Sequence, residues 1–244
     1  KFTILFLFLS FLISPIFIIT KSTIYHFLKK LLGMKSSLRK SINSVLFASS
    51  LDVFTPAKIN DFARLKGEEN KKLALYAIFI ERLLDISTLL IFVFFNNSFY
   101  FIILTIFILF LFSNFFYSLN KSLFNYFNLI SGSLLISLFH WLIAFRIFKA
   151  SFEVILNSLN FNQILTIIDS ITLNKFSIVT ILGVLPISVG GIGIREAAAI
   201  KIFSKIDPYV VFASAVIYGL AVSGSLSLLG ILYVNLNQRF SKLK

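Results

Sequence analysis

The sequence contains no cysteine, which excludes disulfide scaffolds, thiolate metal sites and cysteine nucleophiles. Its two histidines, His26 and His140, stand alone, without a second histidine three or four positions away. A protein metal site is therefore not indicated, no cofactor is expected, and we assign His140 a packing or hydrogen-bonding role. Charge is also scarce: it occupies 14% of positions, whereas soluble domains keep about a quarter of their residues charged. This shortage argues against a soluble protein.

Hydrophobic side chains are abundant instead. They fill 58% of the 244 positions, and 31 residues are phenylalanine. Five apolar runs approach the roughly 20 residues that about 30 Å of hydrocarbon requires. They are Phe2 to Thr20, Leu73 to Phe95, Ser98 to Leu119, Leu129 to Phe148 and Tyr209 to Val234. The sequence therefore predicts an all-α polytopic membrane protein, with residues 1–244 as a single transmembrane domain.

The first apolar run contains Pro15, which we expect to interrupt it, and ends at a basic stretch that begins with Lys21. No small-residue cleavage spacing follows, so a stop-transfer anchor fits better than a signal peptide.

Two other apolar stretches are broken and fit poorly as simple spans. Ile42 to Thr55 is about fourteen residues long and ends before Pro56, a length typical of re-entrant or interfacial segments. The second broken region, Phe152 to about Phe203, contains an apolar run from Phe176 to Leu185 that ends before Pro186, and three glycines follow. Irregular backbone persists in lipid only where protein or a watery cavity satisfies its polar groups. We therefore expect two re-entrant segments, with helix breaks at Pro56 and Pro186.

Basic residues indicate the orientation. Eleven Lys or Arg residues lie between Lys21 and Lys72, and three more lie close to the C-terminus. By the positive-inside rule, the basic loop 21–72 and the C-terminus are expected in the cytoplasm of a multi-pass cell-membrane protein. The net charge of +13 then mostly reflects topology, and nucleic-acid binding has little support because the basic residues adjoin membrane spans.

Glu81, Arg82 and Asp85 lie inside the run from Leu73 to Phe95. At about 1.5 Å per helical residue they are roughly 12 to 18 Å deep, close to the bilayer midplane. Three charges at that depth cost about 8 to 10 kcal/mol, which roughly cancels the gain from the apolar residues around them. Glu81 and Asp85 share a helix face, and Arg82 can reach Asp85. Either the charges form a self-satisfied cluster that fixes helix packing, or they line a substrate cavity.

Each proline break is followed by an arginine. Arg64 comes eight residues after Pro56, and Arg195 comes nine residues after Pro186. Paired interrupted segments in corresponding places point to an inverted-repeat transporter, because helix ends offer unpaired backbone groups to a polar ligand. The glycines between Pro186 and Arg195 do not indicate a nucleotide loop, since no strand–helix–strand pattern flanks them.

Three motifs in this order, Pro56–Arg64, Glu81–Asp85 and Leu185–Glu196, resemble the lysylphosphatidylglycerol synthase transmembrane region, also called the flippase-like domain family. The resemblance covers about residues 40–235. Two residues depart from the family pattern: Lys58 and Asn60 stand where Arg and Gly are usual. Family members commonly have one more N-terminal helix, and the chain begins with Lys rather than Met, so we expect a native N-terminal helix to be missing.

The resemblance implies a helical domain with two re-entrant elements that moves or handles aminoacylated or glycosylated lipids, without the soluble synthase domain. We therefore expect a non-enzymatic protein that binds or flips a lipid with an anionic or sugar-bearing headgroup. Expected headgroup-binding residues are Arg64, Arg195, Asp61, Gly190, Gly191 and Gly193, and the expected intramembrane charges are Glu81, Arg82, Asp85 and Glu196. For Arg195 and Glu196, a local charged pair at a helix start is the alternative.

Two other functions stay open. The protein can be a non-transporting partner that anchors or supplies lipid to a lipid-modifying enzyme or glycosyltransferase. It can also be a membrane-embedded lipid transferase or hydrolase that uses Asp61 or Glu81 as a base, although the sequence offers no set of nucleophile, base and orienting residue.

Overall fold

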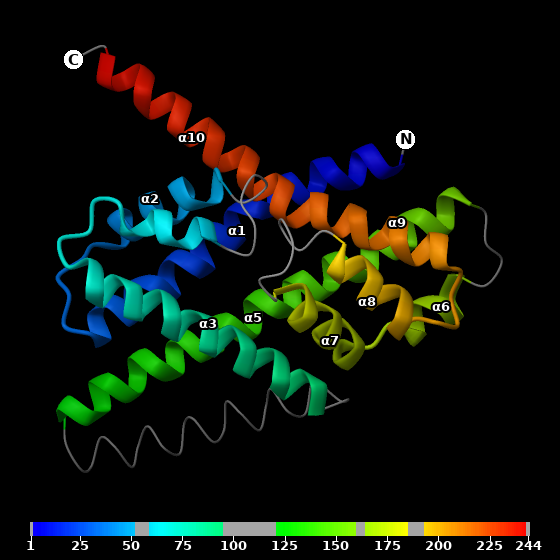
Figure 1. Ribbon diagram of the computed structural model, residues 1–244, viewed down its shortest axis with the longest axis horizontal. Helices are drawn as coiled ribbons and strands as arrows, with labels where there is room; N and C mark the ends of the chain where they lie inside the picture. Colours follow the sequence, from blue (N-terminus) through cyan, green and yellow to red (C-terminus); the bar gives the residue numbers. More distant parts are fainter. Residues whose placement is uncertain (1, 52–58, 95–120, 160–163, 185–192, 243–244) are drawn as a thin grey trace.

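A computed structural model describes residues 2–51, 59–94, 121–159, 164–184 and 193–242, and every regular element within them is helical (Figure 1). The α-helices are α1 (Phe2–Leu31), α2 (Leu38–Ser49), α3 (Lys71–Phe94), α5 (Lys121–Ser158), α6 (Ile164–Ser170), α7 (Leu173–Val184), α8 (Ile194–Ile202), α9 (Pro208–Gly219) and α10 (Ser225–Lys242). A 3-10 helix, η1 (Ile59–Leu65), and a π-helical segment, η2 (Leu220–Gly224), complete them. The predicted all-α class is confirmed for these residues.

Among the described residues, three helical segments are long and apolar enough to cross a membrane: Thr3–Leu31, Asn125–Ser158 and Pro208–Leu236. The pair α6 and α7, bent by 64° at a short break, makes a fourth if it forms one span. Helix α3 has 24 residues but carries three central charges and is not among them. The expected run 98–119 lies outside the described residues. Three of the five predicted spans thus coincide with helices of spanning length.

The first helix corrects two expectations. It continues unbroken through Pro15 and beyond Thr20, so residues 21–31 are helix and the segment 21–72 is not a loop. Proline cannot donate to the carbonyl four residues earlier, but the hydroxyl of Ser14 donates to that carbonyl, at Phe11, over 2.6 Å. The side chain thus satisfies the group that Pro15 leaves open, as Ser and Thr do in membrane helices.

Helix α1 ends at a glycine. Gly33 has a φ of 76°, and its N–H donates to the carbonyl of Lys30. The N–H of Met34 donates to the carbonyl of Lys29, which completes a Schellman motif. The turn sends the chain into α2, whose N-cap Ser37 accepts from the N–H of Lys40.

The two broken stretches have a common pattern of short helices. Helix α2 precedes residues 52–58 and η1 follows them, whereas α7 precedes residues 185–192 and α8 follows them. Both α2 and α7 are 12 residues long, too short to cross a bilayer. Pro56 and Pro186 themselves lie outside the described residues. The expected run from Ile42 to Thr55 is corrected at its start, because α2 begins at Leu38.

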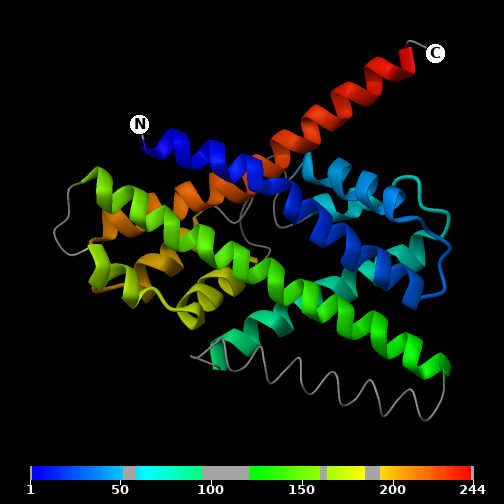
Figure 2. The ribbon, with the colours of Figure 1, turned by 180° about the vertical axis from the view of Figure 1, so that it is seen from behind.

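Helices α1 and α5 run across the whole molecule (Figures 1 and 2). Elements α2, η1 and the start of α3 lie toward one end of this pair, and α6, α7, α8 and α9 lie toward the other. Helix α5 packs against both sets, with contacts to α1, α3, α6, α7 and α9. The interior where these helices converge holds the charged residues described below.

Aromatic rings join the helices at the α9 end. Phe148 on α5 packs with ring centroids 5.2 Å from Phe176 on α7 and 5.3 Å from Tyr218 on α9. Phe152 and Phe203 extend the cluster by one helical turn. All of these rings are buried, and each pair contributes about 0.5 to 1.5 kcal/mol beyond its buried area. The cluster fixes α8 and α9 against α5.

Helices α9 and α10 form one span through η2. A π-helical turn inside an α-helix shifts the faces of the residues that follow, and such turns often occur at functional sites. Further along, Gly230 allows α10 to lie against the end of α2, because an added Cβ would be 2.4 Å from the backbone nitrogen of Ser50. The hydroxyl of Ser227 donates to the carbonyl of Ser49 at 2.9 Å, beside the same contact.

Candidate functional site

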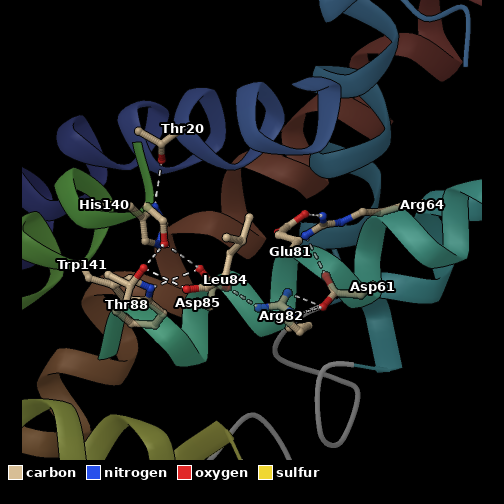
Figure 3. Close-up of polar contacts among 11 residues, drawn as sticks. Thr20, Asp61, Arg64, Glu81, Arg82, Leu84, Asp85, Thr88, His140 and Trp141 are labelled. Carbon is tan, nitrogen blue, oxygen red and sulfur yellow. Dashed lines mark hydrogen bonds and ion pairs between the residues drawn. The ribbon is translucent and has the colours of Figure 1, made fainter. Parts of the chain in front are cut away.

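A buried ion cluster joins η1 to the middle of α3 (Figure 3). Asp61 and Arg64 stand three residues apart in a 3-10 helix, where such positions eclipse each other, and Asp61 Oδ1 is 2.8 Å from Arg64 Nη2. Arg64 Nη1 donates to Glu81 Oε2 over 2.7 Å. Arg82 donates to Asp61 through Nε and Nη2, and through Nη1 to Asp85 over 3.1 Å. The predicted contact between Arg82 and Asp85 is present.

Arg64 is wholly internal to this cluster. Its side chain is 2% exposed, and Glu81, with which it pairs, is 1% exposed. Burial alone would lower the pKa of the guanidinium, but the carboxylates of Asp61 and Glu81 raise it above its ordinary value, so Arg64 stays cationic. Because Arg64 pairs with Asp61 on η1 and with Glu81 on α3, it fixes η1 against α3. The geometry therefore favours the packing alternative for Glu81 and gives Arg64 the same role, in place of the expected headgroup contact.

Asp85 connects the cluster to α5. Its Oδ1 accepts from Trp141 Nε1 at 3.2 Å and from Ser137 Oγ at 3.3 Å. Thr88, one turn further along α3, donates to Ser137 Oγ over 3.1 Å. These contacts join the carboxylate of Asp85 on α3 to two side chains of α5. The hydrogen bonds also fix the register between α3 and α5 (Figure 3).

Arg195 and Glu196 form a second charged pair at the start of α8. Arg195 donates to Glu196 Oε1 through Nε at 3.1 Å and through Nη2 at 2.8 Å. The other carboxylate oxygen of Glu196 accepts from the N–H of Gly193 at 2.5 Å, and Gly193 has a φ of 96°. A carboxylate at this position neutralises the positive end of the helix dipole. The predicted local pair at a helix start is thus present.

Two glycines leave the space in which the Arg195 side chain lies. A Cβ added at Gly183 would be 3.1 Å from the Cβ of Arg195, and one added at Gly219 would overlap its Nη2. Tyr218 lies next to Gly219, and its ring centroid is 5.6 Å from the guanidinium carbon. The side chain of Arg195 thus lies between α7 and α9, with its aliphatic part at Gly183 and its guanidinium at Gly219 and beside an aromatic ring, a favourable environment for a cation.

A central cavity of about 80 Å³ lies where these elements meet. Three basic residues line it, and they are Lys21 on α1, Arg82 on α3 and Arg195 on α8. The remaining lining residues are Phe17, His140, Trp141, Ala144, Thr180, Gly183, Tyr218, Val222, Ser223 and Leu226. The structure therefore brings Arg195 to the same cavity as Arg82, whereas Arg64 does not line it.

Four further residues of the cavity were missed as site residues in the sequence: Lys21, His140, Trp141 and Tyr218. Lys21 was interpreted as the start of a basic loop, yet it stands on α1 one helical turn from Phe17, which also lines the cavity. A prediction that the helix continues past Thr20 would have placed Lys21 on the same helix face as Phe17. The other three lie within apolar helices and give no signal of their own.

Of the remaining predicted site residues, only Gly193 is described. Pro56, Pro186, Gly190 and Gly191 lie outside the described residues.

Comparison with known proteins gives no assignment. No protein-family model, curated protein or solved structure matches the chain. The function is therefore argued from the cavity and its charged residues, since a helical membrane fold alone implies none.

Proposed function

We propose that this integral membrane protein binds a polar-headed lipid, with an anionic or sugar-bearing headgroup, and moves it across the bilayer. Arg195 carries the proposal. Its two hydrogen bonds to Glu196 use Nε and Nη2, and neither uses Nη1. Among the described residues no partner uses Nη1, and a buried guanidinium that lines a cavity with such a donor is suited to bind a phosphate oxygen.

Lys21 and Arg82 support the same ligand. Both line the cavity with Arg195. Arg82 is paired with Asp61 and Asp85, and Arg195 with Glu196, so the two arginines offer N–H donors, and Lys21 adds a positive charge that favours an anionic group in a low-dielectric setting. Arg82 is held in place by its bonds to Asp61 and Asp85, so its position needs little reorganisation when a ligand binds. Preorganisation of this kind lowers the cost of binding.

The volume of the cavity limits which part of a ligand it can enclose. Pockets that enclose whole drug-sized molecules measure roughly 300 to 1,000 Å³, several times the 80 Å³ found here. The cavity therefore holds a headgroup or part of one, and the hydrocarbon of the lipid lies outside it. In this proposal the family resemblance of the three motifs and the polar cavity point to the same class of ligand.

Lipid binding can be tested by native mass spectrometry of the purified protein with phosphatidylglycerol. Arg195→Gln removes the cation but keeps a hydrogen-bonding side chain, and Arg39→Gln, at an exposed position on α2, is the matched control. A charge-assisted hydrogen bond contributes about 1.5 to 3 kcal/mol, so we expect Arg195→Gln to weaken binding by about ten-fold or more. The control should bind as the wild type does. Equal binding by both variants would refute the role of Arg195.

A transport assay then separates moving a lipid from presenting it. A protein that supplies lipid to a lipid-modifying enzyme would bind phosphatidylglycerol through Arg195 but leave its transbilayer distribution unchanged. Loss of binding and transport together in Arg195→Gln is the result that the proposal requires.

A further inference from the structure

A second hollow lies on the outer surface between α1 and α5. It measures about 330 Å³ and is open on one side. Its lining residues are Ile19, Thr20 and Thr23 from α1, and Leu135, Ile136 and Phe139 from α5. Among the described residues that line it, only the two threonines are polar, and the hydroxyl of Thr23 donates to the carbonyl of Ile19 at 2.8 Å. We call this hollow the α1–α5 groove.

The groove lies near the middle of two helices that are long enough to span a membrane. Residues 19–23 lie within the segment Thr3–Leu31, and residues 135–139 lie within Asn125–Ser158. Ile19 and Phe139 are each 54% exposed. In a bilayer, such exposed apolar side chains at mid-helix face the hydrocarbon region. Lipid chains are therefore the molecules that reach this groove.

One hydrogen-bonded pair links the lining of the groove to the lining of the central cavity. Thr20 lines the groove, His140 lines the cavity, and Thr20 Oγ1 lies 2.8 Å from His140 Nδ1. Figure 3 shows this pair between α1 and the polar network of Asp85 and Trp141. Phe17 packs edge-on against the imidazole, with ring centroids 4.8 Å apart. The Thr20–His140 contact thus joins the lining of an apolar hollow to the lining of a cavity that includes Lys21, Arg82 and Arg195.

We propose that the α1–α5 groove binds an acyl chain of the same lipid whose headgroup enters the cavity, so that the lipid straddles the Thr20–His140 pair. The inference rests on the proposed function. The cavity is too small for a whole lipid, and the groove offers apolar surface beside it. A single lipid thus keeps its charge among Lys21, Arg82 and Arg195 and its hydrocarbon among Ile136, Phe139 and their neighbours.

Filling the groove tests the inference. Ile136→Trp places a large ring in the hollow without touching the cavity, and Phe212→Trp, at a half-exposed position on α9, controls for an added indole on the lipid-facing surface. We expect Ile136→Trp to weaken binding of long-chain phosphatidylglycerol about ten-fold, whereas glycerophosphoglycerol, which has no acyl chains, binds as to the wild type. Wild-type affinity of Ile136→Trp for the long-chain lipid would overturn the inference.

The pattern of results separates this inference from the proposed function. If long-chain binding falls in Arg195→Gln but not in Ile136→Trp, the role of the groove is refuted and the headgroup site is supported. If long-chain binding falls in Ile136→Trp but not in Arg195→Gln, the headgroup site at Arg195 is refuted. Loss of both ligands in Ile136→Trp, with a lowered melting temperature, marks a folding defect, and the smaller change Ile136→Ala then replaces it. That variant should weaken long-chain binding only, and unchanged binding would overturn the inference.

Photocrosslinking gives an independent readout in the unmodified protein. A phosphatidylglycerol with a diazirine in its acyl chain should label residues 135–139 and 19–23 more than other lipid-facing positions. Peptide mapping by mass spectrometry measures this enrichment against Phe212 and Leu228, which are exposed on α9 and α10. Labelling that is no stronger in the groove than at these two positions would overturn the inference.

Discussion

Replacement of Arg64 by methionine tests the buried ion cluster most sharply. Methionine is about as long as the arginine side chain without its terminal guanidinium group and carries no charge, so the change leaves Asp61 and Glu81 without their cation. Both carboxylates lose short contacts, of 2.8 Å and 2.7 Å. Removing one partner of a buried ion pair costs about 3 to 5 kcal/mol, because an uncompensated charge remains. We expect Arg64→Met to lower the free energy of unfolding by that amount.

The double variant Arg64→Met with Glu81→Leu should recover at least half of this loss. Replacing a buried ion pair by apolar residues of similar volume is often neutral or stabilising. It also removes two buried atoms, Arg64 Nε and Glu81 Oε1, that have no hydrogen-bond partner within the described residues, and such atoms cost about 1 to 3 kcal/mol each. Asp61 keeps its bonds to Arg82 in this background.

Steric trapping in bicelles measures these free energies, and a double-mutant cycle yields the interaction energy between Arg64 and Glu81. Arg39→Met, at an exposed position, should change stability by no more than about 0.5 kcal/mol. A loss below about 1 kcal/mol for Arg64→Met would refute the reasoning. So would a double variant that is as unstable as the sum of the two single changes.

Two further predictions concern Gly219 and Gly230. Gly224→Ala is the control for both, because an added Cβ there would meet only a side chain, at 4.0 Å. Gly219→Ala should displace Arg195 and weaken phosphatidylglycerol binding in the native mass spectrometry assay. Binding as tight as that of the control would contradict this prediction. Gly230→Ala should force α10 away from the backbone at Ser50 and destabilise the protein by about 1 to 3 kcal/mol in steric trapping. A stability within error of the control would contradict that contact.

Helix type and the larger spans follow from the sequence because hydrophobic length alone determines them. The runs around Leu129–Phe148 and Tyr209–Val234 contain no interruption, and both correspond to helices of spanning length. Spacing also determines contacts within one helix. Arg82 and Asp85 are three residues apart on α3, and the predicted bond between them is present.

Helix ends were predicted less well where a side chain substitutes for a missing backbone donor. Pro15 indicates a break by its covalent structure, but Ser14 satisfies the carbonyl of Phe11 and α1 continues. The charge of Lys21 suggested a loop in water, although the residue lies on α1 and lines a cavity. Local pattern could not reveal that cavity, because the helices that complete it are distant in sequence.

Pairing between distant charges was also beyond the sequence. Arg64 and Arg195 follow their proline breaks at similar distances, of eight and nine residues, and the sequence therefore predicts a shared role. In the structure Arg64 is enclosed by Asp61 and Glu81, whereas Arg195 lines the cavity with Arg82. Each arginine has a carboxylate near it in sequence, and only the tertiary arrangement distinguishes an internal ion pair from a residue at a cavity.

Transbilayer movement of phosphatidylglycerol in proteoliposomes is the most direct measurement of the central claim. A fluorescent headgroup-matched lipid is bleached from the outer leaflet, and the loss of protected signal reports movement. The wild type and Arg39→Gln should move the lipid at equal rates, and Arg195→Gln should be at least about ten-fold slower, in line with the lost charge-assisted bond. Equal rates in all three proteins, or no movement above protein-free vesicles in any, would contradict a transport function that depends on Arg195.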